Sequence, residues 1–145
     1  YDHNPSMDAI YVMSMLFMGK RDLNDRDIRD MAKACTEKGF LPEWTKEKID
    51  YYYWYYASLA LYQTGGPAWD RWQKAMSSTL TEHQRGYSEA DRKAGLTDPK
   101  LLDEYGSWDP VGAWGAAGGR VYATAINCLT LETYYRHQRM EGKHK

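Results

Sequence analysis

Apolar and polar positions occur in blocks along the chain, and these blocks predict five main helices of two kinds. Residues 7–18 and 51–62 are apolar or aromatic at almost every position, and residues 121–135 are largely apolar. A helix that is apolar all round is buried, so we expect these three helices to form the interior. A strand is the alternative for the aromatic run 51–62, but its Ala and Leu residues and its length favour a helix.

Two other segments each carry a single apolar stripe, which predicts amphipathic helices with a solvent-facing side. Asn24 is the expected N-cap of the first helix, and Pro67 stands in the first turn of the second. The stripe residues recur at steps of three and four, and they are Ile28, Met31, Ala32 and Cys35, then Trp69, Trp72, Met76 and Leu80.

The alternation of apolar and amphipathic helices predicts an all-α fold of antiparallel hairpins in two layers, with the apolar helices inside. This is an α/α toroid-type arrangement, and two and a half hairpins suggest a partial toroid. We expect residues 1–145 to be one domain, the C-terminal part of a longer chain. The rest of that parent chain, or a second copy, would then cover the flank of the 7–18 helix. The polar residues 85–105 are expected to form a surface excursion with short helices beginning at Ser88 and Asp98.

Charges are balanced, with 19 Lys and Arg against 20 Asp and Glu, and they are interspersed. A basic patch is therefore absent, and we expect no nucleic-acid partner. No run approaches the roughly 18 consecutive apolar residues of a membrane span. We expect a soluble protein, either cytoplasmic or exported after loss of a targeting segment. Cys35 and Cys128 are too few for a disulfide framework and suit small core positions.

Several motifs together resemble a known family. Gln84 with Gly106-Ser107-Trp108 resembles the QW repeat of the prenyltransferase and squalene-cyclase superfamily, in which the Gln can bond loop backbone while the Trp ring covers the hairpin base. The wider set resembles the C-terminal end of bacterial prenyltransferase and squalene-oxidase repeat proteins, and the resemblance implies the toroid more firmly than any chemistry. The segments that carry it are Tyr52 to Ala57, Gly65 to Trp69, Gly106 to Pro110, Gly118 to Thr124 and Leu131 to Arg136.

No complete catalytic motif is present, and the Asp-x-Asp-Asp acid of squalene-type cyclases is missing. The catalytic candidates are Asp109, Tyr56 and Glu132. For Asp109 the structural alternative is a turn in which the carboxylate bonds its own backbone, and for Glu132 it is a contact with an Arg or a Tyr rather than a buried acid. No cofactor and no metal is expected. Asp25, Asp27 and Asp30 do not all lie on one face of a helix, and Asp109 with Cys128 lacks a third zinc ligand.

Aromatic residues are the main candidates for ligand binding, because rings with hydroxyl groups suit an apolar chain, a peptide or a sugar ring. Arg120 is also expected to reach Asp109, or to stack on a nearby Trp. We expect a non-catalytic binding or scaffold domain for a peptide, protein or glycan. The alternative is a terpenoid or prenyl-group enzyme, or a polysaccharide lyase that uses Tyr as an acid. The candidate ligand-binding residues are Tyr52, Tyr56, Gln63, Trp108, Arg120 and Tyr122.

Overall fold

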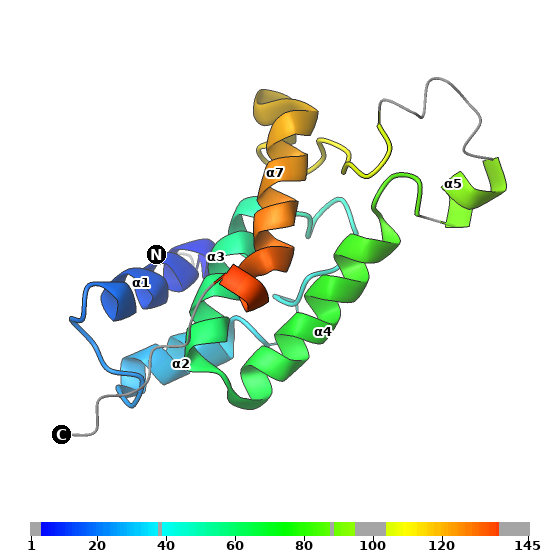
Figure 1. Cartoon of the computed structure of the whole chain (residues 1–145). Helices are drawn as coiled ribbons and strands as arrows, with labels where there is room; N and C mark the ends of the chain where they lie inside the picture. The colour runs from blue at the N-terminus through cyan, green and yellow to red at the C-terminus, as the bar shows by residue number, and fades with distance from the viewer. Residues whose placement is uncertain (1–3, 38, 88, 95–103, 137–145) are drawn as a thin grey trace.

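The computed structural model describes residues 4–37, 39–87, 89–94 and 104–136, and every regular element in these ranges is a helix. The all-α class predicted from the sequence is therefore confirmed, including a helix for the aromatic run. The elements are α1 (Pro5–Phe17), α2 (Arg26–Ala34), α3 (Tyr51–Thr64), α4 (Gly66–Glu82), α5 (Glu89–Ala94) and α7 (Gly115–Arg136), as Figure 1 shows.

Helix α3 is the centre of the fold and packs against α1, α2, α4 and α7 (Figure 1). Its first turn is capped by Asp50, whose carboxylate accepts a hydrogen bond of 3.0 Å from the Tyr53 amide. Most of its side chains are buried, Trp54 and Ala57 among them. It ends at Gly65, whose φ of 66° is a conformation that other residues rarely adopt, and α4 starts at once. The two helices therefore form a tight antiparallel hairpin.

The amphipathic helices place their apolar stripes as the sequence predicts. Trp69, Trp72, Met76 and Leu80 of α4 are all buried, and Trp72 donates its indole N–H to the Ser58 hydroxyl at 2.9 Å. In α2 the cap differs from the prediction. Asp25, not Asn24, is the N-cap and accepts a hydrogen bond from the amide of residue 27 at 3.0 Å. Either side chain is chemically suited to this role, and the helix begins one residue later than expected.

Helices α1 and α7 are not buried all round, which corrects the sequence-based expectation. In α1 only Ala9, Val12 and Leu16 are buried, while Met7 and Phe17 are at least half exposed. These buried positions recur at steps of three and four, so one side of α1 faces its neighbours. Helix α7 is also covered on one side. An apolar composition predicts burial only where a partner exists, and the described part of the chain covers one side of each helix.

Helix α7 contains a sharp kink at Gly119, where φ is 66° and ψ is −171°. The kink separates a short first turn, residues 115–118, from the long segment that packs on α3. Glycine is needed there because a side chain would strain this backbone conformation. Among the described helices, none is both long and apolar enough to cross a membrane.

The 85–105 excursion leaves the helical body at its α4 end, and α5 lies apart from the other helices in Figure 1. Helix α5 begins directly after Ser88, in agreement with the first of the two short helices expected here. The second expected helix, beginning at Asp98, lies outside the described residues. The two ends of the excursion meet, since the Arg85 amide donates to the Ser107 carbonyl at 2.8 Å and the Gly106 amide to the Arg85 carbonyl at 2.9 Å.

Candidate functional site

The loop that follows the excursion is bound to the end of α4 by Gln84 and Trp108. The Gln84 side-chain amide donates to the Gly106 carbonyl at 2.8 Å, and the Trp108 indole donates to the Leu80 carbonyl at 2.8 Å. This arrangement is the one that the Gln and Trp spacing suggested on physical grounds. Because Trp108 is 1% exposed, its ring is part of the core and is not available to a ligand. The ligand-binding role expected for Trp108 is therefore wrong.

Asp109 sits at the centre of an ion-pair cluster formed with Arg85, Glu104 and Arg120. One oxygen, Oδ1, lies 3.0 Å from Nε of Arg85 and 2.9 Å from an Nη atom of Arg120. Glu104 lies 3.2 Å from Arg120. The carboxylate of Asp109 thus accepts from guanidinium groups and not from its own backbone, in contrast to the turn role considered from the sequence. Hydrogen bonding to Asp109 raises the pKa of Arg85.

The Asp109 cluster joins three parts of the chain that are distant in sequence. Arg85 follows α4 at the start of the excursion, Glu104 lies at its end and Asp109 just after it, and Arg120 stands just after the α7 kink. The Asp109 backbone carbonyl also accepts a hydrogen bond of 2.9 Å from the Tyr51 hydroxyl at the start of α3. Arg120 therefore reaches Asp109, as expected. Asp109 and Arg120 therefore link the loop before α7 to α3, to α7 and to the end of α4.

Two further candidates also lie away from any common site. Glu132 is exposed and forms an ion pair of 3.1 Å with Arg136, one turn along α7. It is therefore not a buried acid, and its partner is an arginine, as the structural alternative proposed. Gln63 is 3% exposed near the end of α3, so it is a core residue. Its burial leaves no side-chain surface for the ligand-binding role that the sequence suggested for Gln63.

The remaining aromatic candidates converge on an open pocket of about 480 Å³, which we call the aromatic pocket. Tyr52 comes from the first turn of α3 and Tyr122 from α7, just after the kink. Trp114, immediately before α7, forms the third ring, and its centroid lies 6.4 Å from that of Tyr52. Ala117 and Gly118 complete the lining. The pocket is thus mostly ring and backbone surface, and none of its described lining residues carries a charge.

Glycines near the start of α7 shape this pocket. A Cβ added at Gly118 would lie 2.5 Å from the Tyr122 ring, so the ring packs directly on the backbone. A Cβ at Gly115 would lie 2.2 Å from the Pro110 carbonyl oxygen, so the first turn of α7 also approaches the preceding loop closely. Together with the kink at Gly119, these contacts set the position of Tyr122 relative to Trp114.

The tyrosines beside the aromatic pocket are neutral hydrogen-bonding groups. Tyr56 lies next to Tyr52, with ring centroids 4.7 Å apart, but does not line the pocket. Burial and a hydrogen-bonding contact with Tyr52 raise the pKa of Tyr56. Burial, then the nearby Asp50 carboxylate, raises the pKa of Tyr122. Since the ordinary value is 10.0, both hydroxyls stay protonated at neutral pH.

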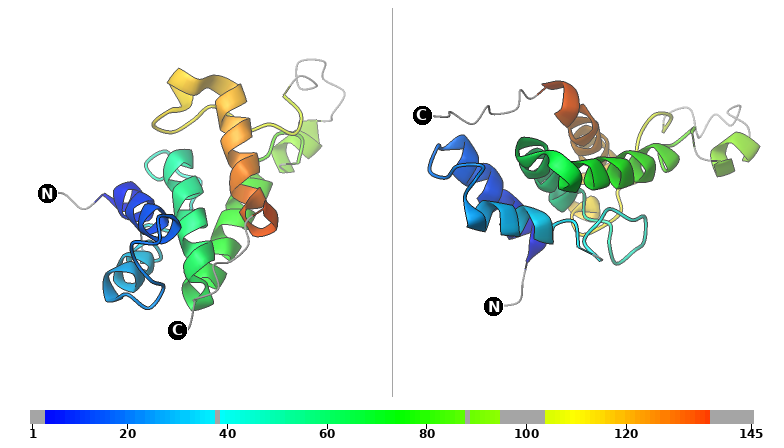
Figure 2. Two further views of the ribbon diagram at one scale, coloured as in Figure 1. Left: turned by 60° about the vertical axis from the view of Figure 1, so that its left-hand side comes forward. Right: turned by 90° about the horizontal axis from the view of Figure 1, so that it is seen from below.

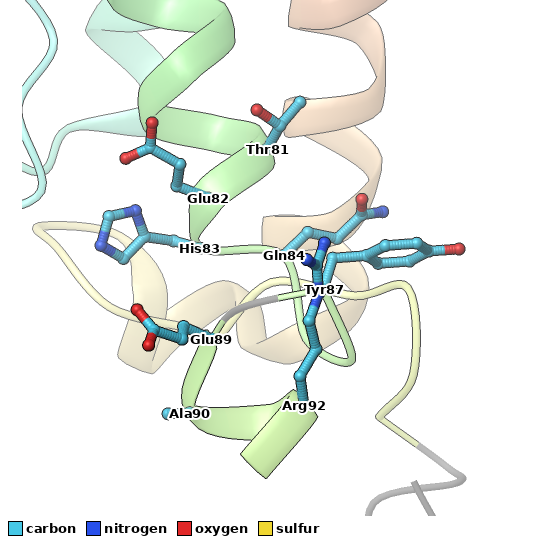
Figure 3. Close-up of a pocket in the computed structure, with 8 residues that line it drawn as sticks. All are labelled: Thr81, Glu82, His83, Gln84, Tyr87, Glu89, Ala90 and Arg92. Atoms are coloured by element: carbon cyan, nitrogen blue, oxygen red, sulfur yellow. The ribbon is translucent and has the colours of Figure 1, made fainter. Parts of the chain in front are cut away.

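A larger hollow of about 840 Å³ lies between the end of α4 and α5, and Figure 3 shows its side chains. Its polar groups do not converge on one point, because Glu82 and His83 lie on one side and the Tyr87 ring on the other (Figure 3). The His83 ring is already engaged, with Nδ1 2.9 Å from the Thr79 carbonyl and the ring stacked 4.3 Å from that of Trp44. We find no catalytic arrangement in this hollow.

Sequence reasoning did not find the full set of residues at either location. Trp114 was considered only as a stacking partner for Arg120, although an exposed Trp in a Gly-rich stretch outside every apolar stripe is a signal for binding. Arg85 was treated only as the start of the excursion. Among the described residues, no group of three His, Cys, Asp or Glu side chains is arranged to hold a metal ion.

Comparison with known proteins adds no assignment, because no protein-family model, curated protein or solved structure matches this chain.

Proposed function

We propose that this chain is a non-catalytic binding domain and that the aromatic pocket holds an extended, apolar segment of a peptide or protein. The observation that carries the proposal is the convergence of Tyr52, Trp114 and Tyr122 on one open, uncharged pocket. Trp114 is 57% exposed, so a ring is already available to a partner without any rearrangement. Aromatic-lined grooves of this kind bind proline-rich peptides in their extended form.

A glycan is the second ligand class expected from the sequence, and the lining of the pocket favours it less. A sugar ring can stack on an aromatic face, but its hydroxyl groups also need hydrogen-bond partners. The pocket offers few of these, because Ala117 and Gly118 supply no polar side-chain atoms and Tyr52 is in contact with Tyr56. An enzyme is not proposed, since Asp109 and Glu132 are paired with arginines outside the pocket.

The packing of the helices also supports the toroid as a proposal. Helix α3 packs on both helices of the preceding hairpin, α1 and α2. Helix α7 packs on α3 and shares a pocket with α4, through Trp69 and Met76 on one side and Leu131 on the other. Packing between successive inner helices thus occurs twice along the chain, α1 with α3 and α3 with α7, as in repeat architectures. We propose that the described helices form an arc of an α/α toroid.

The binding proposal is tested by calorimetric titration with an oligoproline peptide and, separately, with a neutral oligosaccharide. We expect the peptide to bind and Trp114→Ala to weaken binding about tenfold, since aromatic anchors dominate such contacts. Tyr87→Ala is the matched control, because Tyr87 is 45% exposed and lies outside the pocket, and it should bind as the original protein does. Peptide binding that is insensitive to Trp114→Ala would contradict the proposal, and oligosaccharide binding alone would correct the ligand class.

A further inference from the structure

The rings of the aromatic pocket are inclined to one another, so they form the walls of a corner. The centroids of Tyr52 and Trp114 lie 6.4 Å apart and the ring planes meet at 54°, which excludes a stacked pair. Tyr122 supplies the third ring. In the left view of Figure 2, the first turn of α7 is bent away from its long segment and lies at the same end of the molecule as the start of α3.

A corner of aromatic rings attracts a cation. The face of each ring carries the negative part of its quadrupole, and a cation within about 6 Å of the ring centroid is attracted to it. Because the centroids of Tyr52 and Trp114 are 6.4 Å apart, one cation can lie within this distance of both rings. Tryptophan gives the strongest attraction of this kind, and the Trp114 ring is 57% exposed.

The charge beside the aromatic pocket also favours a cation. Asp50 caps the first turn of α3, the turn that carries Tyr52. Burial raises the pKa of Tyr122, and the Asp50 carboxylate raises it further, so the charge of Asp50 acts on the third ring of the pocket. Arg120 is the described basic residue nearest to Tyr122 in sequence, and it is paired with two carboxylates of the Asp109 cluster. The charge of Asp50 therefore favours a cation over an anion.

The scarcity of hydrogen-bond acceptors in the pocket selects among cations. Its lining side chains offer two acceptors, the hydroxyl oxygens of Tyr52 and Tyr122, because the Trp114 indole is a donor only. A lysine ammonium brings three N–H groups and an arginine guanidinium five, and leaving them without partners is costly. A trimethylated ammonium keeps the positive charge and has no N–H group. Its methyl groups can also pack on the rings as apolar surface.

We propose that the aromatic pocket is an aromatic cage for a trimethylated lysine of the bound peptide, with the ammonium group held between the rings of Tyr52, Trp114 and Tyr122. This inference rests on the proposed function, since the lysine belongs to the peptide segment that the pocket binds. It adds the chemical group that the peptide carries. The pocket is open to solvent, so a side chain can enter it while the peptide backbone lies across its mouth.

Three oligoproline peptides that differ in one central residue test the cage by calorimetric titration. The residue is trimethyllysine, its neutral analogue with carbon in place of the nitrogen, or unmodified lysine. We expect trimethyllysine to bind about tenfold tighter than the neutral analogue, which has the same shape without the charge, and also tighter than lysine. Equal affinity for trimethyllysine and the neutral analogue would overturn the cage and leave peptide binding in place. Binding of none of the three would overturn the proposed function as well.

Tetramethylammonium, titrated alone, separates a peptide from a free small molecule as the source of the cation. We expect this ion to compete with the trimethyllysine peptide for the pocket, and to bind more weakly because it lacks the peptide contacts. Binding of tetramethylammonium by a protein that binds none of the three peptides would overturn the peptide as the source.

Asp50→Asn tests the contribution of charge without removing the helix cap, because asparagine caps a helix as well as aspartate does. We expect it to weaken binding of the trimethyllysine peptide about threefold and to leave binding of the neutral analogue unchanged. Asp70→Asn is the matched control, because Asp70 is exposed on α4 near the opposite end of α3 and its replacement removes the same charge. It should change neither affinity. An equal effect of Asp50→Asn on both peptides would overturn the role of its charge.

Discussion

The indole nitrogen of Trp108 donates a hydrogen bond of 2.8 Å to the carbonyl oxygen of Leu80, and both residues are buried. This contact joins the loop that precedes α7 to the last turn of α4. The last carbonyl groups of a helix lack the usual donor four residues on, and the Leu80 carbonyl accepts from the His83 amide at 3.3 Å as well as from the Trp108 indole. Trp108 therefore supplies the shorter of two hydrogen bonds to this carbonyl, and together with Gln84 it fixes the position of the loop.

Two replacements of Trp108 should lower the free energy of unfolding to different extents. Trp108→Phe keeps a ring but removes the shorter of the two hydrogen bonds to the Leu80 carbonyl, and we expect the free energy of unfolding to fall by about 0.5–1.5 kcal/mol. Trp108→Ala also opens a cavity, and the loss should reach about 3–5 kcal/mol. Urea unfolding measures both. Trp114→Ala, at a position 57% exposed, should change the value by no more than about 0.5 kcal/mol. A similar loss for Trp114→Ala would contradict the assignment of Trp108 to the core.

The Asp109 and Arg120 pair should show a small, salt-sensitive coupling. Their side chains are 33% and 29% exposed, so solvent screens the interaction, and a double-mutant cycle of Asp109→Asn and Arg120→Gln should give about 1 kcal/mol or less. The coupling should fall as salt rises from about 0.05 M to about 1 M, because the Debye length shortens. An additive cycle at low salt would show that the pair contributes nothing to stability.

Alkaline pH should destabilise the fold through buried acidic groups. Burial raises the pKa of Cys35 to about 11, and burial also raises the pKa of Tyr51 and Tyr53 above the ordinary 10.0. Such groups lose protons first in the unfolded chain, so their contribution is complete below about pH 9 and is lost as the pH rises from there. Urea unfolding should therefore give a lower free energy at about pH 10.5 than at about pH 8, and Cys35→Ala should reduce the difference.

Two glycines with positive φ should differ in their response to alanine. Gly19 has φ of +63° with nothing within 4 Å of an added Cβ, so Gly19→Ala should cost only the strain of its backbone, about 1–2 kcal/mol. Gly112 has φ of +83°, and a Cβ there would lie 2.4 Å from the Ile49 carbonyl oxygen. Gly112→Ala should therefore cost about 1–3 kcal/mol more. Equal melting temperatures for the two variants would contradict the close contact with Ile49.

The amphipathic helices could be predicted well because their sequences distinguish the buried side from the exposed side. In α4 the Trp and Met residues recur on one side of the helix, and the charged residues between them lie on the other. In α1 almost every position is apolar, and in α7 the polar residues Asn127, Thr130 and Thr133 are buried while Val121 is exposed. The sequence therefore contains no signal that Met7 or Val121 is exposed. The kink at Gly119 was also beyond prediction, because a Gly-Gly pair is compatible with a continuous helix, a turn or a kink.

The aromatic pocket could be predicted only in part for a related reason. Tyr52 and Tyr122 are candidates from the sequence because an aromatic ring with a hydroxyl group suits a ligand, and both line the pocket. Trp108 and Gln63 have equally suitable chemistry, but neighbouring helices and loops bury them. Which polar aromatic residue is open to a ligand depends on contacts between elements distant in sequence. Local patterns do not contain that information.

The backbone contacts between Arg85 and the segment 106–107 affect which insertions and deletions the protein can accept during evolution. The chain leaves the helical body and returns to it at one point, through hydrogen bonds of 2.8 and 2.9 Å. The cost of closing a loop rises only slowly with its length, so residues between Asp91 and Glu104 can be gained or lost while the contacts of these two acids with Arg85 and Arg120 remain. A domain inserted between Asp91 and Glu104 would leave the aromatic pocket as it is.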